Sequence, residues 1–235
     1  MSLNIIKEGH QGYGLLIEKD GYYDRVNKEN TKIIKEARNN PDKFLENPSV
    51  YCVLQKYGIE NRNKRIYPKD IIVGAVDRYM ESVERRSALG AVDHEDSTNI
   101  SLRGDSIGLL IEDIYWDGAT CVGKVYLPVT RAFKETGATY NGADHIANYI
   151  FEHNIMIGIS SRGVGEVKKQ KDKLFVTEYD LICWDWVQLP STIGSWVYKN
   201  PKDVQQHIQK EEDHKTTGAT LNSKFSKLNS FLSAR

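Results

Sequence analysis

The sequence has little cysteine, no excess of either charge and no long apolar run. Lys and Arg together number 32, as do Asp and Glu, so the formal net charge of zero indicates neither nucleic acid nor an anionic membrane as a partner. The apolar runs are far shorter than the roughly 20 residues that span a bilayer. The first residues lack the basic-then-apolar layout of a secretory signal, which favours a cytosolic protein. Three widely spaced cysteines (Cys52, Cys121 and Cys183) fit neither a disulfide framework nor a zinc ribbon, so we expect buried, reduced thiols.

Apolar periodicity and turn residues predict helices mixed with antiparallel strands. Helices are expected at 29–38, 68–86, 141–153, from 200 onward and at 222–235, and strands at 50–57, 107–116, 119–127, 155–160, 164–168 and 173–186. Because strands dominate the middle of the chain, we expect an α+β fold, a mostly antiparallel β-barrel or curled sheet with flanking helices.

Changes of composition divide the chain into three parts. Residues 1–48 are polar and broken by prolines, so we expect an N-terminal arm whose order depends on what it packs against. Residues 49–198 form the expected single domain. Residues 199–235 form a helical tail, with a flexible link at 214–219.

The stretch that most strongly indicates chemistry is GISSRG at residues 158–163, which follows an apolar β-branched run. We expect a buried strand that delivers a serine at its end, where small residues let another backbone come close. Successive side chains on a strand face opposite ways, so only one of Ser160 and Ser161 can be a nucleophile, and the residues alone do not choose. Arg162 and Gly163 suit an oxyanion site, which needs donors and room for close approach.

His94, in the acidic sequence AVDHEDST at residues 91–98, is the candidate base for such a serine. Neighbouring carboxylates favour the imidazolium and so suit a general base. Two other interpretations stay open, a surface histidine among acids and a metal site formed by Asp93, His94, Glu95 and Asp96. In extended backbone only His94 and Asp96 share a face, so a metal site would need further ligands from elsewhere.

A third group should orient the imidazole, as in other serine and histidine sites. The strand expected at 173–186 carries Glu178 and Asp180 on one face, and Asp180 lies in the apolar sequence YDLI. We therefore predict Asp180 as the third catalytic residue. The alternative is a structural acid that binds a backbone N–H or Arg162.

Four segments resemble, in order and spacing, the prohead core proteases of tailed bacteriophages. They are NRNKRIYP at 61–68, LGAVDH at 89–94, IEDIYWDG at 111–118 and GISSRG at 158–163, and the likeness covers about residues 50–198. The resemblance implies a serine endopeptidase of the herpesvirus assemblin type, a β-barrel ringed by helices that needs no cofactor.

The resemblance also implies roles for particular residues. Ser160 falls on the family's nucleophile, His94 on its base and Arg162 on the position that helps the oxyanion site. Around the histidine the family has Gly-Glu-Leu-x-His-Pro, whereas this chain has Ala91 in place of the glutamate and Glu95 in place of the proline. Asp180 rests on the strand pattern alone.

Proteases of this kind imply a particular setting and particular substrates. We expect the protein inside the phage prohead in the host cytoplasm, with scaffold or core proteins and the major capsid protein as substrates. No nucleic acid or membrane partner is expected, and a homo-oligomer is left open. The implied cleavage follows a glutamate preceded two positions earlier by an aliphatic residue, which occurs in the arm at 6–8, 16–18 and 34–36. We therefore expect self-cleavage to remove the arm.

Two other functions are kept beside this one. The changes around His94 motivate a catalytically inactive structural or scaffold component of the prohead with the same fold. The acidic cluster motivates a metal-dependent hydrolase.

Overall fold

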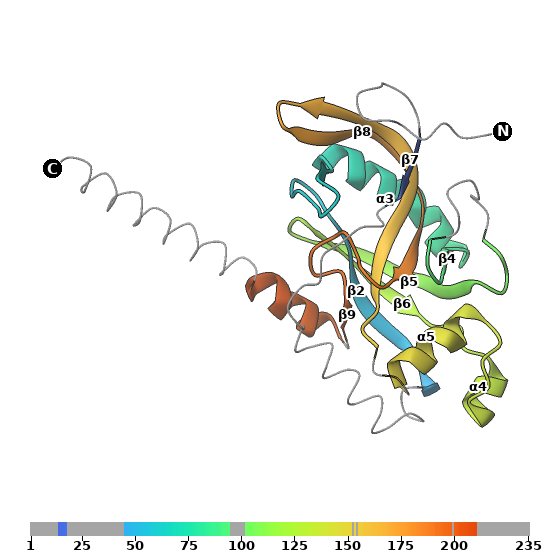
Figure 1. Cartoon of the computed structure of the whole chain (residues 1–235). Helices are drawn as coiled ribbons and strands as arrows, with labels where there is room; N and C mark the ends of the chain where they lie inside the picture. The colour runs from blue at the N-terminus through green and yellow to red at the C-terminus, as the bar shows by residue number, and fades with distance from the viewer. Residues whose placement is uncertain are drawn as a thin grey trace.

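Figure 1 shows the computed structural model of the chain, which describes residues 14–17, 45–94, 102–151, 153, 155–198 and 200–210. The helices expected at 29–38 and 222–235 and the link expected at 214–219 lie outside these residues. Strands are the commonest regular element of the described chain, and they form two sheets.

The first sheet has four strands and is built around one long hairpin. Its order is β1 (Gly14–Ile17), β7 (Gly158–Gln170), β8 (Lys173–Val187) and β3 (Arg65–Ile66). Only β3 runs parallel to its neighbour, and the β7–β8 hairpin projects from the rest of the molecule in Figure 1. The chain reverses at Lys171, whose φ of 56° lies in the left-handed region, at the turn that the sequence predicts.

The prediction of two separate strands at 155–160 and 164–168 is wrong, because β7 is one continuous strand. Gly163 and Gly165 stay in the ladder, opposite Leu181 and Tyr179 of β8. A Cβ on Gly163 would lie 2.5 Å from the ring of Tyr179. This glycine therefore marks close packing within a strand and not a break in it.

The second sheet has five antiparallel strands. Its order is β4 (Leu89–Ala91), β5 (Ile107–Asp117), β6 (Thr120–Tyr126), β2 (Ser49–Lys56) and β9 (Val197–Tyr198). The predicted β5–β6 hairpin is confirmed, with Gly118 at φ 57° in its turn.

An α+β fold with mostly antiparallel strands is confirmed, but the described strands do not close into a barrel. Only isolated bridges, Val92 to Trp186 and Gly158 to Trp196, pair residues of one sheet with residues beside the other. Closure needs a continuous staggered ladder between edge strands. The edge strands are β1 and β3 in one sheet and β4 and β9 in the other, and at two to four residues they are too short to form one.

Helix α3 (Lys69–Glu84) covers the first sheet. Pro68 precedes its first turn, where a missing N–H leaves no intrahelical bond unmade. Its buried face includes the residues that the sequence predicts, which lie three and four apart: Ile72, Val76, Tyr79 and Val83. Arg78 on this helix donates to Tyr179 and Asp180 of β8.

Apart from residues 45–46, which are also helical, three other helical segments are described. α5 (Gly142–Phe151) buries Ile146 and Ile150 as predicted. α4 (Arg131–Thr136) was not predicted, because six residues are too few to show helical periodicity. Residues 201–210 are also helical, and Asn200 caps them as expected by accepting a 3.1 Å hydrogen bond from the Asp203 N–H. None of the described helices is long and apolar enough to cross a membrane.

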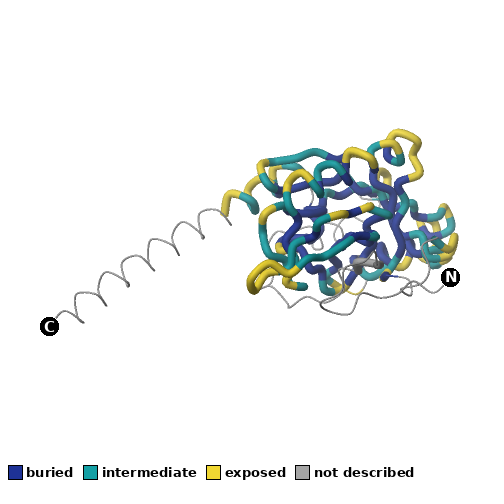
Figure 2. The backbone as a smooth tube through the Cα atoms, turned by 90° about the horizontal axis from the view of Figure 1, so that it is seen from above, coloured by how far each residue is buried: buried dark blue, intermediate teal, exposed yellow. Residues whose placement is uncertain are grey.

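The main core cluster includes residues of both sheets. Figure 2 shows the buried stretches of backbone in dark blue. Trp184 and Trp186 of β8 are almost fully buried, and their indole N–H groups donate to the carbonyl oxygens of Leu54 in β2 and Gly108 in β5. These bonds tie the sheets together and hold the end of β8 in place. All three cysteines are buried free thiols, as predicted.

Candidate active site

Ser160 lies in the third position of β7, inside the strand and not at its end as the sequence analysis expected. Its Cα partner on β8 is Asp185, and both residues are buried. Directly opposed residues of an antiparallel pair point their side chains to the same face. The hairpin therefore places the serine beside a buried carboxylate.

The Asp185 carboxylate accepts hydrogen bonds from three directions. His94 Nδ1 and Arg162 Nε each lie 2.8 Å from Oδ2, and the Ala91 N–H lies 2.8 Å from Oδ1. Burial alone raises the pKa of a carboxyl, but the bonds from His94 and Arg162 outweigh it, so the pKa of Asp185 is lowered. Asp185 is therefore an ionised group held in one orientation.

The backbone before His94 lies against the end of β8. Asp93 donates its N–H to the Trp186 carbonyl oxygen at 2.8 Å, and Asp93 Oδ1 accepts from the His94 N–H at 2.8 Å. Asp93 has a φ of 63°, a left-handed conformation that aspartate tolerates better than most residues. A Cβ on Gly90 would lie 1.8 Å from the Trp184 carbonyl oxygen, so only glycine permits this approach.

The two nitrogens of the His94 ring have different surroundings. Nδ1 faces Asp185, and the side chains of both residues are fully buried. Nε2 is buried and has no hydrogen-bond partner among the described residues. With Asp185 holding Nδ1 as the donor, Nε2 is left as a proton acceptor. A serine nucleophile requires a base with an unoccupied proton acceptor. His94 Nε2 is such an acceptor, and the histidine is held by Asp185, the residue opposite Ser160.

Arg162 occupies the next position on the same face of β7 as Ser160 and is fully buried. Its Nε bonds Asp185, and its Nη2 lies 3.1 Å from Cys183 Sγ and 3.4 Å from Asp185 Oδ1. Burial alone would lower the pKa of the guanidinium, but the hydrogen bond and charge of Asp185 raise it. Burial and the charge of Asp185 hold the pKa of the Cys183 thiol well above its usual range, so the thiol is protonated.

The structure does not bring Asp180 to His94. Asp180 is exposed and bonds Arg78 of α3 at 2.8 Å. It pairs with Val164, four positions beyond Ser160 on β7, which is about 13 Å along a strand. The acid beside His94 is Asp185, which the sequence analysis missed.

Ser161 and Gly163 do not face the histidine either. Strand alternation turns both to the opposite side of β7 from Ser160. Ser161 pairs with Trp184, and its buried Oγ has no hydrogen-bond partner in the described part of the chain.

The segment at 190–196 fixes the start of β7 just before Ser160. The Ser195 hydroxyl lies within hydrogen-bond distance of the carbonyl oxygens of Val53 and Ile159, to either of which it can donate its one hydrogen. The Ser195 carbonyl oxygen accepts from the Ile159 N–H at 3.0 Å. Arg62, from the NRNKRIYP sequence, donates to the Pro190 carbonyl oxygen at 2.6 Å. That sequence therefore supports the position of Ser160.

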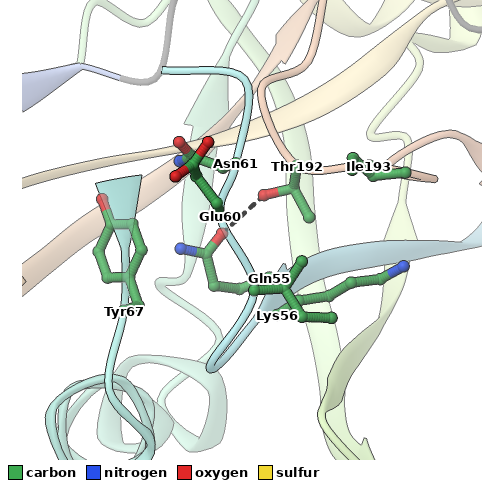
Figure 3. Close-up of a pocket in the computed structure, with 8 residues that line it drawn as sticks. Gln55, Lys56, Glu60, Asn61, Tyr67, Thr192 and Ile193 are labelled. Atoms are coloured by element: carbon green, nitrogen blue, oxygen red, sulfur yellow. Dashed lines mark hydrogen bonds between the residues drawn. The ribbon is translucent and has the colours of Figure 1, made fainter. Parts of the chain in front are cut away.

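Figure 3 shows a small pocket beside this segment, in which Gln55 and Thr192 point toward one another and bond at 2.8 Å. Its lining is Gln55, Lys56, Ile59, Glu60, Asn61, Tyr67, Thr192 and Ile193. Ser160, His94 and Asp185 do not belong to this lining, so the pocket is separate from the buried site.

The acidic sequence around His94 is described only as far as His94, since Glu95 and Asp96 lie outside the described residues. Within the described ranges, no group of three or more His, Cys, Asp or Glu side chains is placed to hold a metal. What lies together is a serine, a histidine and a buried carboxylate, the set of groups that serine hydrolases use.

Comparison with known proteins gives the family. The sequence model of the prohead core protein serine protease family matches residues 15–208. The chain is 27% identical over 172 residues to the prohead core protein protease of Enterobacteria phage T4, covering 71% of this chain and 75% of that protein. It is similar in fold to the solved structure of the bacteriophage T4 capsid assembly protease, gp21, with a TM-score of 0.56 and 21% identity over 76% of this chain and 99% of that one. The chain belongs to the prohead core protein serine protease family, and it is a serine protease.

Proposed function

We propose that Ser160 is the nucleophile of this protease, His94 its general base and Asp185 the group that orients the histidine. The observation that carries the proposal is the buried His94, bonded to Asp185 through Nδ1 and without a partner at Nε2, held by the carboxylate opposite Ser160. Contacts between nucleophile and base are often looser in unliganded enzymes and tighten when substrate binds. A peptide carbonyl entering this site would complete the arrangement.

The reaction is acyl transfer. Ser160 Oγ attacks the peptide carbonyl carbon, and His94 Nε2 takes the hydroxyl proton and passes it to the leaving amine. Water then attacks the ester with the same histidine as base. The Asp185 carboxylate stabilises the imidazolium that forms in both steps, and its lowered pKa keeps it ionised for this role.

Arg162 acts in this proposal through Asp185 and not at the oxyanion. Its Nε and Nη2 both bond groups of β8. A guanidinium with these bonds fixes both carboxylate oxygens and supplies a positive charge behind the anion. We assign it as a positioning residue.

We infer that the substrates are phage scaffold or core proteins and the major capsid protein, cut inside the prohead in the host cytoplasm. Family membership and the names of the T4 prohead protease and of the solved T4 structure support this inference. Residues 49–198 form the proposed protease domain, with a fold related to herpesvirus assemblin. The arm at 1–48 is a substrate for self-cleavage, and a homo-oligomer stays open.

A serine-directed phosphonate tests the catalytic assignment. Wild-type protein should gain one adduct on Ser160, and Ser160→Ala should gain none and should not hydrolyse a peptide with an aliphatic residue two positions before glutamate. Ser161→Ala is the matched control, since it removes an unbonded hydroxyl on the opposite face and should be labelled like wild type.

Each alternative function gives a different result. An inactive scaffold component would gain no adduct in any variant, and the proposal would then fail. A metal-dependent hydrolase would be inhibited by EDTA and insensitive to the phosphonate, which would also overturn the assignment.

A further inference from the structure

The outer edge of β7, opposite to the edge that β8 covers, is paired on both sides of Ser160. Before the serine, Gly158 and Ile159 pair with the segment at 195–196. After it, the four residues Arg162 to Gly165 pair with β1. Ser160 and Ser161 lie between these two pairings.

Strand β1 belongs to the N-terminal arm, yet it lies antiparallel to β7 within two residues of the nucleophile. Its register is uninterrupted, with Gly14 opposite Gly165, Leu15 opposite Val164, Leu16 opposite Gly163 and Ile17 opposite Arg162. The direction of β1 carries the chain toward Ser160. A peptide bound in this register and continued for two more residues would place those residues opposite Ser161 and then Ser160.

A strand added to a sheet edge is held by backbone hydrogen bonds, which any extended peptide can supply. An exposed edge of this kind binds other chains unless something covers it. β1 therefore has the position and direction that a substrate strand would need to bring a peptide bond to the serine.

We propose that the edge of β7 from Arg162 to Gly165 binds the residues that precede the cleaved bond, as an antiparallel strand, and that β1 is the chain's own occupant of this edge. The bond delivered is the one between Glu18 and Lys19. This inference rests on the proposed catalytic role of Ser160. The register alone selects this bond among the three arm sites that the sequence analysis expected.

The chemical step balances without a further reactant except water. Ser160 Oγ bonds to the Glu18 carbonyl carbon while its proton moves to His94, the bond to the Lys19 nitrogen breaks, and that nitrogen takes the proton. Water then hydrolyses the ester and releases a fragment that ends in the Glu18 carboxylate. The fragment still contains β1, so the edge is freed only when the fragment dissociates.

A reversible cross-link tests whether this edge binds substrate. Leu15→Cys with Val164→Cys joins two register partners, whose Cα atoms in an antiparallel pair are separated by roughly 4.5–5.5 Å, within the range of a disulfide. The three native cysteines are buried and should not compete. Leu15→Cys with Glu166→Cys is the control, because a diagonal pair roughly 7–8 Å apart should cross-link poorly.

The oxidised register pair should hydrolyse an external peptide at least about tenfold more slowly than its reduced form, since a tethered strand has an effective concentration on the order of millimolar. Reductant should restore the rate. The tether holds β1 in place even after the bond to Lys19 is cut, so self-cleavage does not relieve the block. Equal rates in the oxidised and reduced forms would overturn the proposal.

Intact mass measurement of the full chain tests the delivered bond. Wild-type protein should yield a species that begins at Lys19, whereas Ser160→Ala should keep its arm. A wild-type arm that stays intact, or is cut only after Glu8 or Glu36, would refute the register. Phosphonate labelling of Ser160 distinguishes failure of this inference from failure of the proposed function. If Ser160 is labelled but the arm is intact or cut only after Glu8 or Glu36, only this inference is contradicted. If Ser160 is not labelled, the proposed function is contradicted.

Discussion

Replacing Asp185 by Asn is the substitution that most directly tests the site. The change keeps the size of the side chain but removes the charge that faces both His94 and Arg162 at 2.8 Å. The amide can present its NH₂ to the imidazole and so favour the wrong tautomer. The matched control is Asp180→Asn, which makes the same change at the acid that the sequence predicted.

The two substitutions should differ widely in stability. In Asp185→Asn the fully buried Arg162 guanidinium loses its counter-charge, and breaking a buried ion pair in this way costs about 3–5 kcal/mol. For a domain of this size that corresponds to a fall in Tm of about 10 °C. The Asp180 and Arg78 side chains are 73% and 61% exposed, so removal of that pair should cost less than about 1 kcal/mol.

The difference in activity should be larger still. Loss of the orienting carboxylate lowers kcat on the order of 10⁴-fold in serine proteases, so kcat/KM of Asp185→Asn should fall by at least about 10³-fold, while Asp180→Asn stays within about twofold of wild type. Rates are measured well below the lower Tm, with the folded fraction of each variant checked by circular dichroism. A folded Asp185→Asn protein within tenfold of wild type, or an Asp180→Asn protein that has lost its activity, would refute the assignment.

Three further predictions concern the same region. Gly90→Ala should lower the free energy of unfolding by about 3 kcal/mol or more, since its Cβ meets a β8 carbonyl oxygen, whereas Gly104→Ala, with open space around it, should be neutral in a urea titration. Asp93→Asn should keep near-wild-type kcat, because Asn tolerates φ 63° and keeps an acceptor for the next N–H. Asp93→Val should cost about 1–2 kcal/mol and misplace His94. Folding lowers the pKa of Asp185, so the ionised carboxylate stabilises the folded protein above its unfolded-state pKa of about 4, and this stabilisation is lost as the pH falls through the lower folded-state pKa. Below about pH 4, the free energy of unfolding should therefore fall less steeply with pH in Asp185→Asn than in wild type.

Local signals in the sequence were sufficient for the elements with strong periodicity or strong turns. The apolar spacing of α3 and the Asp117-Gly118 turn each predict what the structure shows, because neighbouring residues alone determine them. α4 has only six residues and no such pattern. β1 is four residues long, and its pairing with β7 depends on a partner about 150 positions away, which no local pattern reveals.

The site was predicted in part. The sequence singled out Ser160 and His94 as candidates, and the structure brings His94 to the carboxylate opposite Ser160. The predicted acid, Asp180, was chosen because it stands in apolar sequence, a pattern that also fits an exposed residue on a half-buried strand. The stronger signal was an acid between two tryptophans, Trp184 and Trp186, since alternation buries both indoles and forces the carboxylate onto the other buried face.

Asp185 faces Ser160 because the β7–β8 ladder contains two irregularities. The hairpin begins with Gln170 opposite Lys173, and uninterrupted pairing from there would set Ser160 opposite Cys183. The register shifts twice, and each shift advances β8 by one residue. A β-bulge of this kind adds one residue to one strand and re-aims the side chains beyond it, and bulges are common beside active sites. The pairing of Ser160 with Asp185 therefore depends on two extra residues in β8. Alternation counted from the sequence does not detect them, because each bulge reverses which face the following residues occupy.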